Sequence, residues 1–186
     1  NIIMSTLETN LIQPATGTTL TVGASGDQIT AATGVKTSFL YPAFQASISG
    51  DQSLSDGVKA KIQFDTELFD TDSAYDNSTN YRFTPQVAGK YLVYGAVSLW
   101  QDDNTDLKLA SILIYKNGSV VNKTYDNFLA SYTRGSSQQL TVAVDMNGSS
   151  DYVEIYGEIQ ISSGASGLIA ESSDGRTFFG AYRIGT

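Results

Sequence analysis

Apolar and polar residues alternate along most of the chain, and this alternation predicts antiparallel β-strands. Successive side chains of a strand point to opposite faces, so a period of two marks a strand with one buried face. The apolar positions are rich in β-branched and aromatic residues, which strands favour. No segment sustains the 3.6-residue period of an amphipathic helix, so we expect very little helix. The predicted strands are 43–49, 59–64, 81–83, 89–100, 108–116, 120–125, 138–145, 151–161 and 177–184.

Turn residues separate the predicted strands. Asn117-Gly118 lies between two apolar runs and is the strongest signal for a two-residue hairpin, because both residue types tolerate positive φ. Asn147-Gly148 and Asp174-Gly175 supply further turns. Strands broken at such regular intervals favour a sandwich, so we predict an all-β, antiparallel jelly roll.

The amino-acid composition changes near residue 42. Before it, Thr and Gly dominate, and the apolar residues are too scattered to form a core of their own. Segments 18–22 and 28–30 alternate like short strands, but two isolated strands are only marginally stable. We therefore predict an N-terminal arm for anchoring or assembly, 1–41, followed by a jelly-roll domain, 42–186.

The domain carries a spaced pattern of aromatic, acidic and glycine residues. A Phe is followed by an Asx, an aromatic residue, a second Phe and a Gly-x-Tyr, on Phe64, Asp70, Tyr75, Phe83, Gly89 and Tyr91. The closing segment, Thr177–Tyr182, has Phe178 and Gly180 at the fixed points of the same pattern. This pattern resembles that of C1q-like domains. It departs from the family by one extra residue before Phe83 and by Val93 and Gly95, where aromatic residues are usual.

This resemblance implies a C1q/TNF-like jelly roll that associates as a homotrimer, with aromatic side chains of each subunit facing the common axis. A Tyr ring can pack in an apolar interface while its hydroxyl finds a polar partner. We therefore expect four aromatic residues in the core or in the trimer interface: Tyr91, Tyr152, Phe178 and Tyr182.

The N-terminal arm carries a second resemblance. Residues 10–27, NLIQPATGTTLTVGASGD, are similar to the Thr/Gly-rich segments of virion structural proteins of tailed bacteriophages, especially fibre-like and decoration-like ones. The resemblance implies a particle-anchored protein. Residues 4–36 would bind a capsid or tail protein, and the globular heads would project outward.

Composition excludes several kinds of chemistry. The chain has no Cys and no His, which removes disulfides, thiol catalysis, the common Ser-His-Asp triad and the usual transition-metal ligands. The net charge of -8 repels the phosphates of nucleic acids, so no nucleic-acid partner is expected. No apolar run approaches the roughly 20 residues that span a bilayer, so no membrane insertion is expected.

An acidic loop is the first candidate for a binding site. Asp102, Asp103 and Asp106 offer oxygen atoms of the kind that Ca²⁺ takes, but the loop lacks the Gly and terminal Glu spacing of an EF-hand. We therefore predict a solvated loop with no bound metal or other cofactor. Together with an exposed Trp100 just before it, this loop is the predicted ligand contact.

A second acidic group, Asp70, Asp72 and Asp76, has the residue type of a glycosidase carboxylate pair. Asp70 already has a structural place in the C1q-like pattern, and the other two fall in a turn-rich loop. We therefore predict no catalytic residues.

These observations together predict a non-enzymatic homotrimer on the surface of a tailed-bacteriophage virion, made in the host cytoplasm. It would be a capsid decoration protein, a head fibre or a short tail fibre that stabilises the particle or contacts a host surface glycan or protein. The first alternative is a soluble carbohydrate- or protein-binding C1q-like lectin, and the second is a polysaccharide-degrading spike. A lectin would bind glycan without the N-terminal arm, whereas a spike would release sugars.

Overall fold

A computed structural model describes residues 16–17, 42–101, 106–162, 168–170 and 173–185. The chain divides into two units, Asn1–Thr37 and Ser38–Thr186. In the first unit only Thr16 and Gly17 are described, and they form an exposed bend. The predicted N-terminal arm therefore lies almost wholly outside the described residues and stays a prediction.

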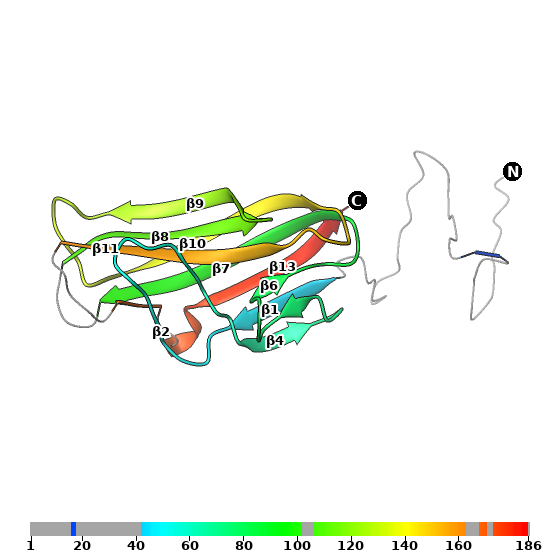
Figure 1. Cartoon of the computed structure of the whole chain (residues 1–186), viewed down its shortest axis with the longest axis horizontal. Coiled ribbons are helices and arrows are strands. Elements are labelled where there is room, and N and C mark those ends of the chain that lie inside the picture. The colour runs from blue at the N-terminus through cyan, green and yellow to red at the C-terminus, as the bar shows by residue number, and fades with distance from the viewer. Residues whose placement is uncertain (1–15, 18–41, 102–105, 163–167, 171–172, 186) are drawn as a thin grey trace, which may run out of the picture. The chain divides into compact units, whose positions relative to one another are not determined.

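The second unit is a sandwich of two antiparallel sheets (Figure 1). Sheet A consists of β1 Ala43–Ser47, β2 Gln52–Ser53, β4 Thr66–Asp70, β7 Gly89–Gln101, β10 Gly135–Met146, β12 Leu168–Ala170 and β13 Phe178–Gly185. Its strand order is β2–β12–β7–β13–β1–β4, and β10 also pairs with β7. The first and last strands are neighbours, with Ala43 opposite Tyr182 and Ser47 opposite Phe178.

Sheet B packs on sheet A and has the order β5–β6–β11–β8–β9, with β3 also pairing with β11. Its strands are β3 Ala60–Lys61, β5 Tyr75–Asp76, β6 Arg82–Phe83, β8 Leu107–Lys116, β9 Ser119–Asn127 and β11 Val153–Ile161. The predicted all-β antiparallel sandwich is confirmed. In the part of the chain that the structure describes, the helical content is one 3₁₀ turn, η1 Ser173–Gly175, and no helix is long and apolar enough to cross a membrane.

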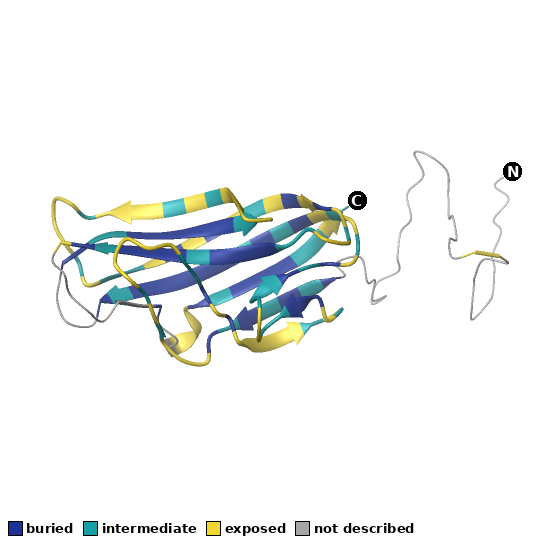
Figure 2. Ribbon diagram, in the orientation of Figure 1, coloured by how far each residue is buried: buried dark blue, intermediate teal, exposed yellow. Residues whose placement is uncertain are grey.

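Every predicted strand has a counterpart, but the prediction missed β2, β4, β5 and β12. All are short, and β4 lacks a buried face because it lies at the edge of its sheet. Figure 2 shows β4 and β9 largely exposed, whereas the long strands between the edges are mostly buried. Only a buried face imposes the alternation by which a strand is predicted from sequence.

The core is built around a stack of aromatic rings. Phe44 is fully buried, and its ring stacks on those of Tyr75 and Phe83, each with a centroid distance of 4.5 Å. Phe179 meets the same ring edge-on at 4.8 Å, and Phe83 meets Tyr91 at 5.7 Å. Four aromatic residues of the spaced pattern, Phe64, Tyr75, Phe83 and Tyr91, therefore converge in the core between the two sheets.

Asp70 and the Asn-Gly turn show how the pattern shapes the backbone. The Asp70 carboxylate accepts the N–H of Tyr75 at 2.8 Å and that of Asp72 at 3.2 Å, which turns the chain after β4. Asn117 and Gly118 have φ values of 51° and 76° and join Lys116 to Ser119 of the facing strand. The predicted two-residue hairpin is confirmed.

Candidate functional site

The outward face of sheet A carries half-buried aromatic side chains. On β13, Phe179 and Ala181 are fully buried in the sandwich, so the alternating Phe178 and Tyr182 point outward. The ring of Tyr94, on β7, lies 6.3 Å from that of Phe178 and 6.2 Å from that of Tyr182. We call Tyr94, Phe178 and Tyr182 the outer aromatic cluster.

Gly180 fixes the position of the Tyr94 ring. The two residues are opposite each other in the pairing of β7 with β13, and a Cβ atom at Gly180 would lie 2.4 Å from the Tyr94 ring. The ring therefore lies across the strand over Gly180, and its hydroxyl donates to Gln45 Oε1 on β1 at 3.1 Å. Burial, with a smaller contribution from Tyr182, raises the pKa of Tyr94. The Tyr94 ring is thus held in one arrangement before any partner binds.

Trp100 lies on the same face of β7 and is half-buried, which corrects the predicted exposure. Its ring covers Gly135 of β10, where a Cβ atom would lie 2.7 Å from the ring. The indole N–H donates to Ser98 Oγ at 2.9 Å, and the Arg134 guanidinium lies 5.8 Å from the ring centroid. The start of β10 therefore covers Trp100. This burial could not be predicted without knowing that β10 pairs with β7.

The four predicted aromatic residues fall in three places. Phe178 and Tyr182 lie together on the outward face. Tyr91 lies in the core, where its hydroxyl donates to the carbonyl of Val87 at 2.7 Å and burial raises its pKa to about 12. Tyr152 lies under the Arg82 guanidinium, 4.5 Å from the ring centroid.

Tyr94 was missed as a site residue. The period-two spacing of Leu92, Tyr94 and Ala96 places these three residues on one face of a strand, and Gly180 belongs to the C1q-like pattern. The pairing of Tyr94 with Gly180 cannot be predicted from either segment alone.

The acidic loop is described only in part. Asp102 and Asp103 lie outside the described residues. Asp106 is buried rather than solvated. Its N–H donates to Gln101 Oε1 at 3.4 Å, and its carbonyl accepts the N–H of Ser162 at 3.0 Å. Among the described residues, no group of three or more His, Cys, Asp or Glu side chains is placed to hold a metal ion. A ligand contact at Trp100 and this loop stays a prediction.

In the second acidic group, the Asp76 side chain caps a turn of the backbone. The Asp76 carboxylate accepts the N–H groups of Ser78, Thr79 and Asn80 at 3.1, 2.9 and 3.1 Å. These hydrogen bonds, that of Thr79 above all, hold the pKa of Asp76 far below its ordinary range. A carboxylate that is ionised and saturated with backbone donors is a poor general acid, which fits a turn cap better than catalysis.

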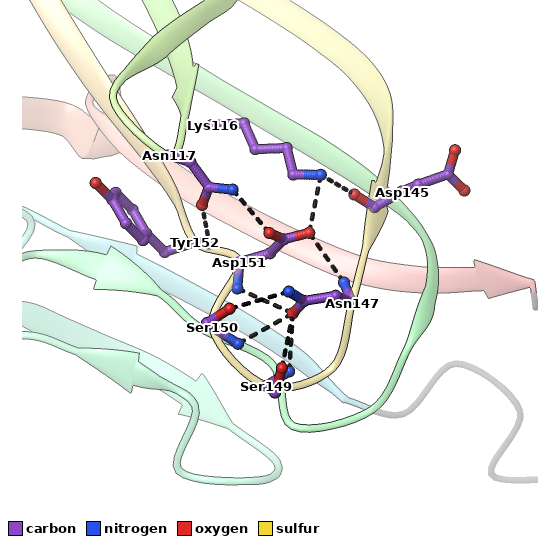
Figure 3. A network of polar contacts seen from close by, with 8 residues as sticks. All are labelled: Lys116, Asn117, Asp145, Asn147, Ser149, Ser150, Asp151 and Tyr152. Atoms are coloured by element: carbon purple, nitrogen blue, oxygen red, sulfur yellow. Dashed lines mark hydrogen bonds and ion pairs between the residues drawn. The ribbon is translucent and has the colours of Figure 1, made fainter.

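A polar network joins two loops at one end of the sandwich (Figure 3). The Asp151 carboxylate accepts Asn117 Nδ2 at 2.7 Å and the N–H of Asn147 at 3.0 Å, and it pairs with Lys116 Nζ at 2.9 Å. Asn147 Oδ1 in turn accepts the backbone N–H groups of residues 149–151, each at 3.0 Å. The network therefore ties the β8–β9 turn to the β10–β11 loop.

The Asp151→Asn variant is expected to lose part of the acid sensitivity of the fold. Hydrogen bonds from Lys116 and Asn117 hold the pKa of Asp151 below its ordinary value of 3.8. A depressed pKa stabilises the fold above the unfolded-state value, and this contribution is lost as the pH falls through the folded-state pKa. Thermal unfolding followed by circular dichroism should show Tm falling below pH 3.8, and falling less steeply in the variant.

A matched variant controls for the loss of one carboxylate. Asp174 also pairs with a cation, Arg176 at 2.9 Å, but its side chain is 71% exposed. Exposed ion pairs contribute little, so Asp174→Asn should leave the pH profile of Tm unchanged. Equal slopes for the two variants would contradict the assignment to Asp151.

Residues of the segment from Asp76 to Arg82 contribute to the linings of two polar cavities. The first has a volume of about 380 Å³ and is lined by Ser49, Gly50, Asp51, Gln52, Ser53, Gln63, Asp65 and Tyr81. The second has a volume of about 390 Å³ and is lined by Ser73, Ala74, Tyr75, Asp76, Asn80, Arg82, Thr84 and Gln86. Neither cavity could be predicted from the sequence, because each is lined by segments that lie apart along the chain.

Comparison with known proteins agrees with this architecture. A family model described as the C1q domain matches residues 43–183. The crystal structure of murine APRIL at pH 5.0 superimposes with a TM-score of 0.56 at 11% identity, covering 77% of this chain and 98% of that one. The structure of Eiger TNF from S. frugiperda gives a TM-score of 0.51 at 12% identity, covering 78% and 93%. No curated protein matches the sequence.

These structural likenesses concern the fold, and they confirm the C1q/TNF-like part of the predicted resemblance. The similarity of the N-terminal arm to virion proteins stays a prediction.

Proposed function

The chain belongs to the C1q domain family, and from this premise we propose that it is a non-enzymatic homotrimer whose subunits meet through the outward face of sheet A. The outer aromatic cluster carries this proposal. Aromatic residues are enriched in subunit interfaces, and a monomeric protein rarely leaves a contiguous apolar patch uncovered. The Tyr94 ring is already fixed over Gly180, so association would order few side chains.

The surroundings of the cluster have the composition of an interface. Leu92 lies opposite Tyr182 on the same face, and Ile184 continues the apolar row with 45% exposure. Charged residues gather at the margin, where Lys90 and Asp145 pair at 3.4 Å. An apolar centre with a polar rim is the usual arrangement of a protein–protein interface.

Light scattering on the full chain tests the association. We expect the mass of three chains for the natural protein and of one chain for Tyr182→Asp, because a carboxylate without a partner is costly to bury in an apolar interface. Tyr125→Asp is the matched control, since Tyr125 is 56% exposed on β9 of the other sheet, and it should remain trimeric. A monomeric natural protein, or equal dissociation of both folded variants, would contradict the proposal.

We further propose that the trimer is a surface component of a tailed-bacteriophage virion, either a capsid decoration protein or head fibre or a short tail fibre. Residues 4–36 would bind a capsid or tail protein, and the heads would contact a host glycan or protein. The Thr/Gly-rich sequence of residues 10–27 supports this, and its apolar residues are too scattered to form an independent core. Absence of the chain from purified virions of the phage that encodes it, measured by mass spectrometry, would overturn this part.

A further inference from the structure

Two residues of the segment that leads into β6 have an unusual backbone conformation. Ser73 and Tyr81 have φ values of 52° and 49°, which residues other than Gly rarely adopt. The other non-glycine residues of positive φ in the described part, Asn117 and Asp174, each precede a Gly in a turn, where this conformation is ordinary. Backbone strain at a bulky residue such as Tyr81 suggests a functional constraint.

The neighbours of Tyr81 hold it in place. Lys61 Nζ donates to the carbonyl of Asn80 at 2.9 Å and also pairs with the buried carboxylate of Glu154. The Asp76 carboxylate accepts the Asn80 N–H at 3.1 Å and its side-chain amide at 2.7 Å. The residue before Tyr81 is therefore anchored from two sides, and the strained conformation persists in the folded protein.

Tyr81 is the one aromatic residue in the lining of the 380 Å³ cavity. The rest of that lining consists of glycine and of hydroxyl, amide and carboxylate side chains, and it contains no Lys or Arg. The volume lies in the lower part of the range of small-molecule sites, and the cavity is open to solvent on one side. A ring beside many hydrogen-bonding groups suits a ligand that has both an apolar face and several hydroxyls.

Hydrogen bonds fix the walls of this cavity. Asp65 accepts the N–H of Ser49 at 2.7 Å and its hydroxyl at 2.6 Å, and these bonds outweigh partial burial and lower the pKa of Asp65. The Gln52 amide donates to the carbonyl of Lys61 and accepts the N–H of Gln63, both at 2.8 Å. A wall that is already ordered loses little conformational entropy when a ligand binds.

From this arrangement we propose that the cavity binds a neutral saccharide unit, with its C–H face against Tyr81 and its hydroxyls toward Asp65 and Gln63. The absence of cationic side chains from the lining disfavours phosphate, sulfate or an acidic sugar. A metal ion is disfavoured because the described residues contain no cluster of three acidic side chains. The inference names the ligand class for the proposed host contact, but it does not rest on the trimer, since no lining residue belongs to β7 or β13.

Saturation-transfer NMR on the full chain tests the proposal, with free glucose, galactose, mannose and N-acetylglucosamine as probes. At least one sugar should receive saturation on its C–H protons. Tyr81→Gly should remove this signal or weaken binding by about tenfold, because the ring contact is lost. The same variant should fold without loss of stability from backbone strain, because Gly adopts positive φ freely.

Tyr132→Gly is the matched control, since Tyr132 is 42% exposed and lies outside the cavity, and it should retain the signal. No saturation of any of the four sugars would overturn the proposal. So would a signal that survives in Tyr81→Gly, or one that requires added Ca²⁺. Sugar binding by a protein that proves monomeric would leave this inference standing while the trimer fails.

Discussion

Replacing Phe44 by Ala is expected to lower the free energy of unfolding by about 3–5 kcal/mol. The Phe44 ring is fully buried between Tyr75 and Phe83 and under the edge of Phe179. Its removal would leave a cavity between the two sheets and abolish three aromatic contacts at once. A loss of this size is a large part of the total stability of a domain, so urea denaturation should show a much lower midpoint.

Phe69 supplies the matched control for this result. It belongs to the neighbouring strand β4, opposite Gln45, and its side chain is 46% exposed. Phe69→Ala removes the same atoms without opening a cavity, so we expect a change of about 0.5 kcal/mol or less. If the two variants lost similar stability, the aromatic stack would not be the centre of the core.

Replacing Gly148 by Ala should lower the free energy of unfolding by about 2–4 kcal/mol, because the substitution combines backbone strain with a steric clash. Gly148 has a φ of 70°, and a Cβ atom there would lie 2.2 Å from the backbone nitrogen of Ala88. Because backbone cannot move aside as a flexible side chain can, the β10–β11 loop and the segment before β7 would have to separate. Urea denaturation measures the loss.

Gly175→Ala separates the two causes. Gly175 has a φ of 65°, but no atom lies within 4 Å of the position of its Cβ. Its substitution should therefore lower the free energy of unfolding only by the cost of backbone strain, about 1 kcal/mol. The difference between the two variants measures the clash, and equal losses would show that Ala88 relaxes without cost.

The sequence predicted the core of the fold well because local patterns reflect burial directly. The strands that form β7, β8 and β11 have a buried face along their whole length, so their apolar residues recur in register. The edge strand β4 has no such face, and nothing in its residues separates it from a loop. Asn117-Gly118 was predictable for a different reason, since the turn depends on two adjacent residues only.

The candidate sites were predicted less well because they depend on pairing between distant segments. Phe178 and Tyr182 could be assigned to one face by spacing, but the place of Tyr94 beside them depends on its pairing with Gly180. Likewise, the burial of Trp100 depends on Gly135 of β10. The backbone conformation of Tyr81 has no signal in its residue type, so the cavity beside it was not predictable.

The pairing of β1 with β13 sets an order of events during synthesis. Ala43 is made long before Tyr182, yet the two are opposite each other in the finished sheet, so sheet A cannot close until the last strand has left the ribosome. Such distant contacts slow folding. The outer aromatic cluster is completed by the same strand, because Phe178 and Tyr182 join Tyr94 only when β13 pairs with β7. A nascent chain therefore carries the proposed association surface only in part until its own domain has folded.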